Sequence, residues 1–558
     1  MAVDQGDQQP AGRVMIMKGH LFICASILIL FISTPIKARI IHVPADSSTI
    51  QAGINGAVDG DTVLVARGHY YERINFVGKA VLVTSNWIFD NDSITIDSTI
   101  IDAENSGSAV TFSTSEDSSS IIQGFTITNG NASSGGGVYC FFASPTISNN
   151  IVTTNIATDG GGIYSHPASP TISNNTITSN SATNGGGIYC VELSPTINHN
   201  TISMNIATHW GGGIYCFYMF SPTISNNTIS GNSAGAEGGG LYCDMFAFAS
   251  AINSNVITGN FAGSYGGGIF CTHLSSSTII ANNTVNGNSA GLSGGGIACA
   301  LSEPIISNNI INGNIVSEYG GGIFCFVIYA PAITNNIICY NSAGSRGGGV
   351  CCASSSPSII NNIISNNLDG EGIASLYDSY PVVCYNNVWN NIDGNFYGCP
   401  TGMGDTIWGV NFNDTHCDSF YNIIRDPLFA DSINFELLCN SPCIDAGDPD
   451  IYVRPDSGGC RIDMGAHEYP YILGDANSDS IITPKESRIG AVNIGDIVFL
   501  INYLFQSGLA PCPYHAGDTN CDGEINLADI VCLINYLFRG GVLPCESGVT
   551  INTSVSDM

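Results

Sequence analysis

Oxygen-bearing side chains near the C-terminus alternate with the spacing of a calcium-binding loop. In GDTNCDGEINLADIVCLINYLFRGG, residues 517–541, the candidate ligands are Asp518, Asn520, Asp522, Glu524 (through its carbonyl) and Asp529. They stand at positions 1, 3, 5, 7 and 12 of a twelve-residue loop, with Gly523 at its sharp turn. Oxygen ligands at alternate positions of such a loop wrap one hard cation. The sequence therefore predicts a Ca²⁺ site.

An earlier segment repeats this pattern less regularly. It offers Asp475, Asn477, Asp479 and Asp496, with about ten extra residues, 482–491, inserted in the loop. Each loop runs into an apolar segment of helical spacing, GDIVFLINYLF in the first copy and ADIVCLINYLF in the second. We therefore expect two loop–helix halves, of which the second has the more regular calcium loop.

Repeated units make up most of the sequence that precedes this module, and they define its expected strands. A Gly-Gly-Gly triplet is centred on Gly136, Gly161, Gly186, Gly212, Gly239, Gly267, Gly295, Gly321 and Gly348. The units are 25 to 28 residues long and read approximately SPTISNNxIxxNSAxxxGGGIYC. Each contains three short β-type runs with Asn or Gly at the corners, and helical periodicity is missing. This predicts a parallel β-helix in which equivalent residues stack about 4.8 Å apart.

Two columns of side chains follow from the alternation within GGGIYC. The inward column is Cys140, Ser165, Cys190, Cys216, Cys243, Cys271, Cys299, Cys325 and Cys352. The alternative to packing is metal binding or redox chemistry; we interpret the column as core because one member is Ser and paired His ligands are missing. The outward column is Tyr139, Tyr164, Tyr189, Tyr215, Tyr242, Phe270, Ala298, Phe324 and Cys351. We expect its rings to be exposed and to contact a polysaccharide; the alternative is that they shield a strand edge or pack under the following loops.

A catalytic set is harder to assemble in the repeats. The best acid pair is Glu192 and Asp244, which lie two rungs apart, about 9.6 Å. That separation is near the upper limit for an inverting glycosidase. Their positions in the unit do not match, so solvated loop acids are the alternative, and the repeats offer no convincing catalytic set.

Composition restricts the function and the location. The net charge is −31, with 14 Lys+Arg against 45 Asp+Glu, which argues against nucleic acid as a partner.

The N-terminal residues predict export. Lys18, the apolar stretch 21–32 and Ala38 are typical of a secretory signal peptide, here over residues 1–38. Later segments do not have the length and apolarity of a membrane helix. We expect an exported protein, secreted or attached to a cell surface.

The sequence resembles secreted right-handed parallel β-helix proteins of the pectin-lyase-like class. The resemblance lies in the repeats, in the entry segment VPADSSTIQAGINGAVDGDTVLVARGHYYERINFVGKAVLV and in the closing segment GGCRIDMGAHEY. The resemblance covers about residues 41–469 and implies a short helix near residues 49–58 that plugs the open end. It implies that Asp445, Asp448, Arg461 and Asp463 pair as a structural cap on the last rungs; the alternative is that these charges are catalytic. The fold hosts lyases, hydrolases, epimerases and adhesins, so function does not follow from it.

The two loop–helix halves resemble a type I dockerin over about residues 474–544. This implies Ca²⁺ binding and a cohesin-domain partner. In that family the recognition positions correspond to Ile494, Gly495, Leu527 and Ala528, which are apolar here. A Cys512–Cys545 disulfide would join the halves, and some of Cys399, Cys417, Cys439, Cys443 and Cys460 should be oxidised in the same compartment.

The expected domains are a signal peptide (1–38), an N-terminal cap with the first rungs (39–130), the Gly-rich β-helix (131–370), its closing segment (371–472), a dockerin-like domain (473–548) and a tail (549–558). The favoured hypothesis is a β-helix protein that binds carbohydrate or another surface ligand and is anchored through the dockerin. The alternatives are a tethered polysaccharide lyase or glycosidase and a structural or adhesive spacer.

Overall fold

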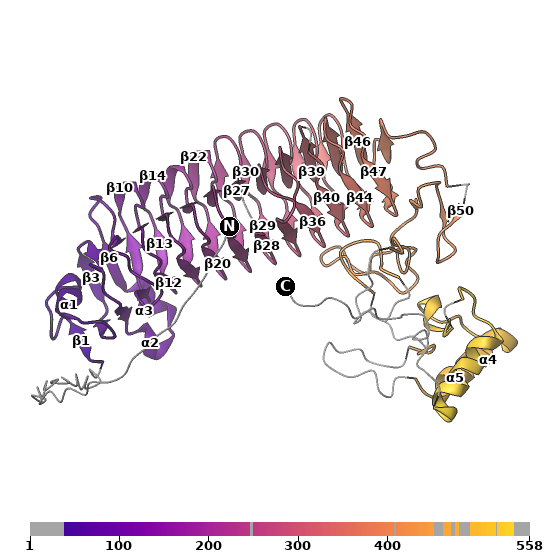
Figure 1. Cartoon of the computed structure of the whole chain (residues 1–558), viewed down its shortest axis with the longest axis horizontal. Helices are drawn as coiled ribbons and strands as arrows, with labels where there is room; N and C mark the ends of the chain where they lie inside the picture. Colours follow the sequence, from indigo (N-terminus) through magenta and orange to yellow (C-terminus); the bar gives the residue numbers. More distant parts are fainter. Residues whose placement is uncertain are drawn as a thin grey trace, which may run out of the picture. The chain divides into compact units, whose positions relative to one another are not determined.

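The computed structural model describes residues 38–245, 249–327, 329–406, 409–450, 461–469, 475–478, 492–520 and 522–540. The predicted signal peptide (except Ala38), Asp479, Cys460, Cys545 and the tail lie outside these residues. Figure 1 shows the rungs following one another from β1 to β47, and the helices α4 and α5 of the C-terminal module.

Four parallel sheets make up the rungs within the described residues. Sheet A has 14 strands, from β1 (Ile40–Val43) to β47 (Val382–Cys384), and sheet B has 13, from β3 (Gly68–Tyr71) to β48 (Asn387–Trp389). Sheet D has nine short strands, from β10 (Asn131–Ser134) to β42 (Ser342–Ala343).

Sheet C has 13 strands and carries the repeated GGGIYC segments. Its strands are β4 (Ile74–Asn75), β7 (Val110–Phe112), β11 (Val138–Phe141), β15 (Ile163–His166), β19 (Ile188–Val191), β23 (Ile214–Phe217), β27 (Leu241–Asp244), β31 (Ile269–Thr272), β35 (Ile297–Ala300), β39 (Ile323–Phe326), β43 (Val350–Ala353), β46 (Ile373–Leu376) and β49 (Phe396–Tyr397).

The predicted parallel β-helix is confirmed, with one addition. A complete rung runs through β17 (Thr176–Thr178), β18 (Ser181–Asn184), β19 and β20 (Thr196–Asn198). Three of these strands were expected, and the fourth, β18, belongs to sheet D. The register is that of the repeat, since Ile188, Tyr189 and Cys190 pair with Ile214, Tyr215 and Cys216.

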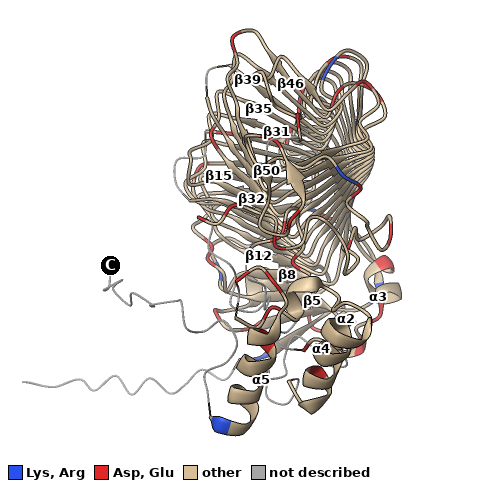
Figure 2. Ribbon diagram, turned by 90° about the vertical axis from the view of Figure 1, so that its right-hand side faces the viewer, with Lys and Arg blue, Asp and Glu red and all other residues tan. Residues whose placement is uncertain are grey.

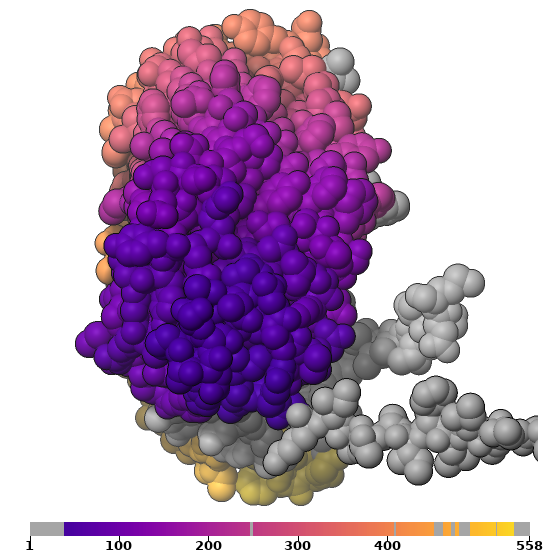
Figure 3. Space-filling model, turned by 90° about the vertical axis from the view of Figure 1, so that its left-hand side faces the viewer, coloured from indigo at the N-terminus to yellow at the C-terminus, as the bar shows by residue number. Residues whose placement is uncertain are grey.

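A short helix covers the first rung, as the entry segment predicted. Helix α1 (Ile50–Gly56) is capped by the Thr49 hydroxyl, and it buries Ile50 and Ile54 completely. The Lys79 ammonium donates to the carbonyls of Ile54, Asn55 and Ala57, which complements the helix C-terminus. Helices α2 (Trp87–Asp90) and α3 (Ser93–Asp97) follow. In Figure 3 the indigo residues of this cap form a closed surface over the end of the coil.

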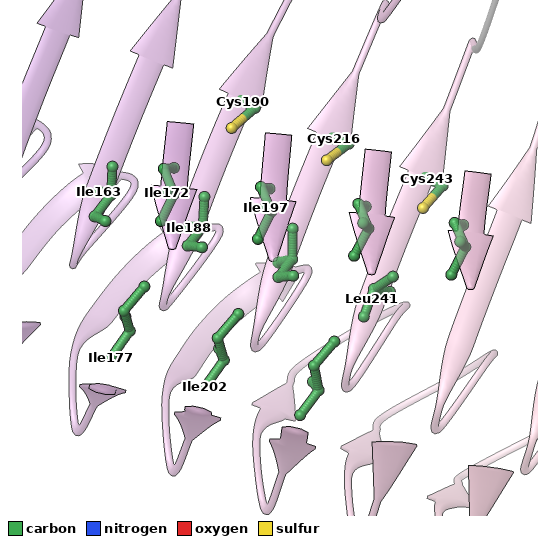
Figure 4. Packing of buried hydrophobic residues seen from close by; sticks show 14 of the residues in the cluster. Ile163, Ile172, Ile177, Ile188, Cys190, Ile197, Ile202, Cys216, Leu241 and Cys243 are labelled. Atoms are coloured by element: carbon green, nitrogen blue, oxygen red, sulfur yellow. The ribbon is translucent and has the colours of Figure 1, made fainter. Parts of the chain in front are cut away.

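The interior is a set of aliphatic and thiol columns. Ile163, Ile188 and Leu241 face Ile172 and Ile197 across the coil, and Cys190, Cys216 and Cys243 form a line beside them (Figure 4). Burial raises the pKa of Cys140 well above its ordinary value, which disfavours the reactive thiolate. The inward cysteines are fully or almost fully buried thiols in the apolar core, as the sequence indicated.

Asparagine has two structural roles at the corners of the rungs. The first Asn of the NN pair takes a left-handed backbone at many rungs, with φ of 56° at Asn174. The second is buried, and its amide donates to the amide oxygen of the equivalent Asn in the next rung. One ladder contains Asn150, Asn175, Asn200, Asn227, Asn255, Asn283, Asn309, Asn336, Asn362, Asn386 and Asn422. A second ladder, at the corner between sheets B and D, contains Asn155, Asn180, Asn205, Asn232, Asn260, Asn288, Asn314, Asn341, Asn367 and Asn391.

Breaking a ladder should cost stability. The amide of Asn260 donates to the carbonyl of Ile229 and the side chain of Asn288 at 2.9 Å, and its oxygen accepts from Asn232. We expect Asn260→Leu to lower the free energy of unfolding by about 3 kcal/mol, because it leaves buried polar groups without partners. Urea denaturation measures the change. Asn282→Gly, at an exposed left-handed corner, should change it by less than about 0.5 kcal/mol. Equal effects would contradict the ladder's role.

The closing segment lies against the last rungs. Its buried residues Phe435, Cys443 and Met464 pack with Ile337 and Ile363. A short hairpin, β50 (Gly409–Val410) and β51 (His416–Cys417), precedes it.

Two buried carboxylates hold this segment together. The Asp463 carboxylate accepts from the backbone N–H groups of Asp445 and Tyr469, and Asp445 accepts from that of Arg461. The Arg461 guanidinium lies 4.6 Å from the ring centroid of Phe412. The acids of the expected cap thus bind backbone, and Arg461 contacts an aromatic ring.

The cysteine pairing differs from the expectation. Cys512 forms a disulfide with Cys439, with the Cα atoms 5.3 Å apart, so the predicted Cys512–Cys545 bond is wrong. Cys399, Cys417 and Cys443 are thiols. The bond joins the closing segment to the chain that leads into the second loop–helix half. None of the helices that the structure describes is long and apolar enough to cross a membrane.

Candidate functional site

The second predicted calcium loop is closed by its own carboxylates. Asp518 is completely buried and accepts from the N–H groups of Asp522 and Gly523 at 3.1 and 2.8 Å. Asp529, also buried, accepts from Thr519 and from Asn526, the N-cap of α5 (Leu527–Arg539). The loop therefore wraps back onto the first turn of its helix.

The electrostatics of this loop fit a divalent cation. Burial and the neighbouring Asp518 raise the pKa of Asp529 above its ordinary value. A cation that binds both carboxylates relieves this cost. The described residues do not gather three His, Cys, Asp or Glu side chains as a preformed metal cluster.

The first loop–helix half reproduces the geometry of the second. Asn477 N–H donates to Asp496 at 3.2 Å, as Asn520 N–H donates to Asp529 at 3.2 Å. Asn493 caps α4 (Ile494–Gln506) with the same capping box that Asn526 forms on α5. The sequence reasoning overlooked these two Asn residues, although both stand at position 9 relative to a position-12 Asp.

Each helix exposes an apolar ridge. Of the predicted recognition residues, Ile494 and Leu527 are each 59% exposed, and Ala528 is exposed as well. The ridge continues through Val498 and Phe505 on α4 and through Val531 and Phe538 on α5, at the same spacing 33 residues later. Figure 2 shows that the rest of the two helices carries few charged residues. Buried Leu500 and Leu533 hold the helices together.

Residues 490–538 match the family described as the dockerin type I domain. The C-terminal module is a type I dockerin domain. Such domains bind calcium, and the dockerin implies a cohesin partner and anchoring in a cellulosome-type extracellular complex.

The rungs match two further families. Residues 84–229 match the right handed beta helix region, and residues 208–301 match a protein family of unknown function, DUF1565. No curated protein matches the chain. Among solved structures, the chain is similar to an Arg-to-Ala mutant and the unmutated form of a PL6 family alginate lyase, AlyGC. The identities are 14% and 13%, the TM-scores are 0.41 and 0.34, and each alignment covers 75% of this chain and 60% of the other.

The outer face of sheet C carries the predicted aromatic column. The rings of Tyr139, Tyr164 and Tyr189 stack with centroids 5.6 and 5.5 Å apart and planes within 7°. These three are partly exposed. Both faces of the Tyr164 ring thus meet neighbouring rings, and its edge and hydroxyl are what remain for a ligand.

The expectation that the whole column is exposed is wrong. Tyr215, Tyr242, Phe270 and Phe324 are 5–8% exposed. Aromatic side chains that stand directly before some of the Gly triplets pack on the column. Trp210, for example, lies 6.2 and 6.0 Å from the rings of Tyr215 and Tyr242. The alternative, packing of the rings under other segments, holds for these four.

The two acids of the predicted pair, Glu192 and Asp244, contact different histidines. The Glu192 carboxylate lies 3.7 Å from His166, whereas the Asp244 carboxylate lies 3.1 Å from Nδ1 of His273. Burial, together with the charges of Asp244 and Glu237, raises the pKa of the Tyr242 phenol. Burial raises the pKa of Glu237 above its ordinary value.

Two other features combine polar groups with a ring or a cavity, but their polar groups are already partnered. Arg346, the one Arg of the repeats, pairs with buried Glu371 and lies 3.9 Å from the ring centroid of Tyr397. A cavity of about 910 Å³ lies beside the Cys439–Cys512 bond. Asn413, on its lining, donates its amide to the carbonyls of Pro442 and Ile444. These polar groups serve the packing of the closing segment.

Proposed function

We propose that this protein is exported, binds carbohydrate on the outer face of sheet C, and is held in an extracellular complex by calcium-dependent binding of its dockerin domain to a cohesin. The observation that carries the proposal is the pair of equivalent loop–helix halves, each with a buried position-12 Asp and an exposed apolar ridge.

The calcium ligands in this proposal are Asp518, Asn520, Asp522, Glu524 and Asp529 in the second loop and Asp475, Asn477, Asp479 and Asp496 in the first. Bound Ca²⁺ supplies the positive charge that the buried carboxylates need. The loops then fix the orientation of α4 and α5, so that Ile494, Gly495, Leu527 and Ala528 contact the cohesin together with the rest of each ridge.

Carbohydrate binding rests on the aromatic face of sheet C. The phenols of Tyr139, Tyr164 and Tyr189 form a rigid row on one side of the coil. The rungs fix their spacing, so little side-chain entropy is lost on binding. An extended glycan that runs along the coil meets several of these groups at once.

A two-part binding experiment tests the proposal. Full-length protein is captured on immobilised cohesins in Ca²⁺ and in chelator, and the captured protein is offered a panel of soluble polysaccharides. We expect capture only in Ca²⁺, and Tyr139→Ser with Tyr164→Ser to weaken glycan binding by about tenfold, or ~1.4 kcal/mol. Phe261→Ser, which changes a 46% exposed ring on sheet D, is the matched control. Capture that is equally strong in chelator would refute calcium-dependent anchoring. Equal glycan binding by the tyrosine double variant and the Phe261→Ser control would refute carbohydrate binding on sheet C.

A further inference from the structure

Sheet D carries an exposed column in which large apolar residues alternate with Ser from rung to rung; we call it the alternating column. The first residue of each strand points outward, whereas the second, such as Ala182 after Ser181, is buried. The strands pair in register, so the outward residues stand one above another. From β14 (Ile156–Asp159) to β42 the column reads Ile156, Ser181, Ile206, Ser233, Phe261, Ser289, Ile315 and Ser342.

The large members of this column are exposed and lie two rungs apart. The exposed fractions are 49%, 52%, 46% and 57% for Ile156, Ile206, Phe261 and Ile315. Two rungs correspond to about 9.6 Å, and the shorter Ser between them leaves a gap between two large side chains. Figure 1 shows β14, β22 (Ile206–Trp210) and β30 (Phe261–Ala262) following one another along one side of the coil.

The surface around the column is low and almost uncharged. Over four successive rungs, the corner that precedes the strand is a glycine with a positive φ: Gly231, Gly259, Gly287 and Gly313. The strands of sheet D contain one charged residue, Asp159, whose carboxylate accepts from the Asn184 amide. Copies of a chain with a net charge of −31 repel one another, so an uncharged face is where two of them can approach.

We propose that sheet D binds sheet D of a second copy of this chain, face to face, in a two-fold symmetric dimer. The two-fold axis runs along the strand direction, so the two coils are antiparallel. The rung of Ser233 then lies opposite the rung of Phe261 of the second copy. Across the whole interface, each large residue faces a Ser: Phe261 faces Ser233, Ile206 faces Ser289, Ile315 faces Ser181 and Ile156 faces Ser342.

The alternation is what identifies a second copy as the partner. In a two-fold interface, if one residue contacts another, the reverse contact is also made. A column with a period of two rungs fits its own copy when the copies are offset by one rung, because large side chains then enter gaps, as in interdigitated sheet pairs. The corners agree with this register, since Met204, 66% exposed, comes opposite Gly287, whose ideal Cβ has open space around it.

The area of this face is sufficient for a specific dimer. Eight rungs extend for about 38 Å along the coil, and the five residues from the corner Gly to the residue after the strand extend for about 17 Å. The face therefore covers about 650 Å² per copy, or about 1,300 Å² in total, which is within the range of specific interfaces. With four large side chains per copy, we expect a dissociation constant in the micromolar range.

Sedimentation velocity of the full-length protein in Ca²⁺, over a concentration series that brackets the micromolar range, tests this proposal. We expect a monomer at the lowest concentrations and a dimer at the highest. Ile206→Ser with Ile315→Ser should weaken the dimer at least tenfold. Val256→Ser with Ile279→Ser is the matched control, because both residues are 43% exposed on strands of sheets B and A, and it should change the dissociation constant less than twofold.

Crosslinking tests the antiparallel register. Face-to-face sheets lie about 10 Å apart, so the two copies of residue 233 are about 11 Å apart in this dimer, whereas those of residue 131 are more than about 40 Å apart. A thiol-specific crosslinker that spans about 12 Å should therefore join Ser233→Cys into dimers above the wild-type background and leave Asn131→Cys at that background.

Several results would overturn the proposal. A monomer at every concentration would do so, as would equal dimerisation of the two serine double variants, which would place the interface on another surface such as the ridges of α4 and α5. Crosslinking of both cysteine variants would show a parallel arrangement, and crosslinking of neither would show that sheet D is not the interface. Sheet C faces another side of the coil, so none of these results changes the proposed carbohydrate binding.

Discussion

Replacing Asp518 and Asp529 together by Ala is expected to abolish retention of the protein on an immobilised cohesin. Both carboxylates are buried, and they occupy the first and last ligand positions of the second loop. Without them the cation has lost two anionic ligands, and the N–H groups of Gly523 and Asn526 have lost their acceptors. We expect the apparent Kd to rise by at least 100-fold, measured by surface plasmon resonance in millimolar Ca²⁺.

A change within the same loop provides the control. Glu524 supplies only its backbone carbonyl at position 7, and its side chain is exposed. Glu524→Gln should therefore keep both calcium and cohesin affinity within twofold. The single change Asp475→Ala should have a smaller effect than the double change, because it touches one ligand of the interrupted loop. Retention of the double variant at wild-type level would contradict calcium-dependent anchoring through this loop.

Calcium should also stabilise the module itself. A ligand that binds only the folded state at 100 times its Kd adds about 2.7 kcal/mol to the free energy of unfolding. The dockerin core is small, with Leu500 and Leu533 among its few fully buried side chains, so a gain of this size is a large part of its stability. The double variant should show little of this gain.

The stacking of the rungs was predictable from the repeat because one unit determines all its neighbours. Equivalent residues pair in register, so the inner place of Ile188 and Cys190 follows from alternation within a single strand. The dual use of Asn at the corners follows in the same way, since each left-handed position and each amide bond recurs from rung to rung.

The exposure of the aromatic column was not predictable from alternation alone. An outward residue is exposed only if no other segment covers it, and coverage depends on the residue before each Gly triplet. That residue is Asp159 or Asn184 where the tyrosines remain partly exposed, and Trp210, Tyr265 or Tyr319 farther along the coil. The larger side chains pack on the column, as Tyr265 does on Phe270 at 6.3 Å.

The Cys439–Cys512 bond was beyond sequence reasoning for a different reason. Its partners are 73 residues apart and belong to segments without a shared repeat. The similarity of the two loop–helix halves suggested a pairing inside the module, yet the approach of the closing segment decides the outcome. Where two cysteines are brought together by irregular segments, their separation in the sequence does not predict that they pair.

Replacing Gly186 by Val is expected to destabilise the coil severely. The Gly-Gly-Gly triplet uses its residues differently: Gly185 has a φ of 62°, whereas Gly186 is restricted by space. A Cβ at Gly186 would lie 2.6 Å from the carbonyl oxygen of Gly212 and 2.7 Å from that of Ile206. Both are backbone atoms of neighbouring rung segments, so relief requires the strands themselves to separate. We expect a loss of more than about 4 kcal/mol, or loss of soluble protein.

Thermal and urea unfolding measure this effect against a control that keeps the backbone angle but has open space. Gly259 has a φ of 63° and no heavy atom within 4 Å of its ideal Cβ. Gly259→Asn should cost about 1 kcal/mol or less, because Asn adopts the left-handed region readily. An unchanged melting profile for Gly186→Val would contradict the close approach of the rungs. Because Gly161 and Gly239 meet the same carbonyl contacts, the repeated triplet is a packing requirement of the stack, independent of what the outer face binds.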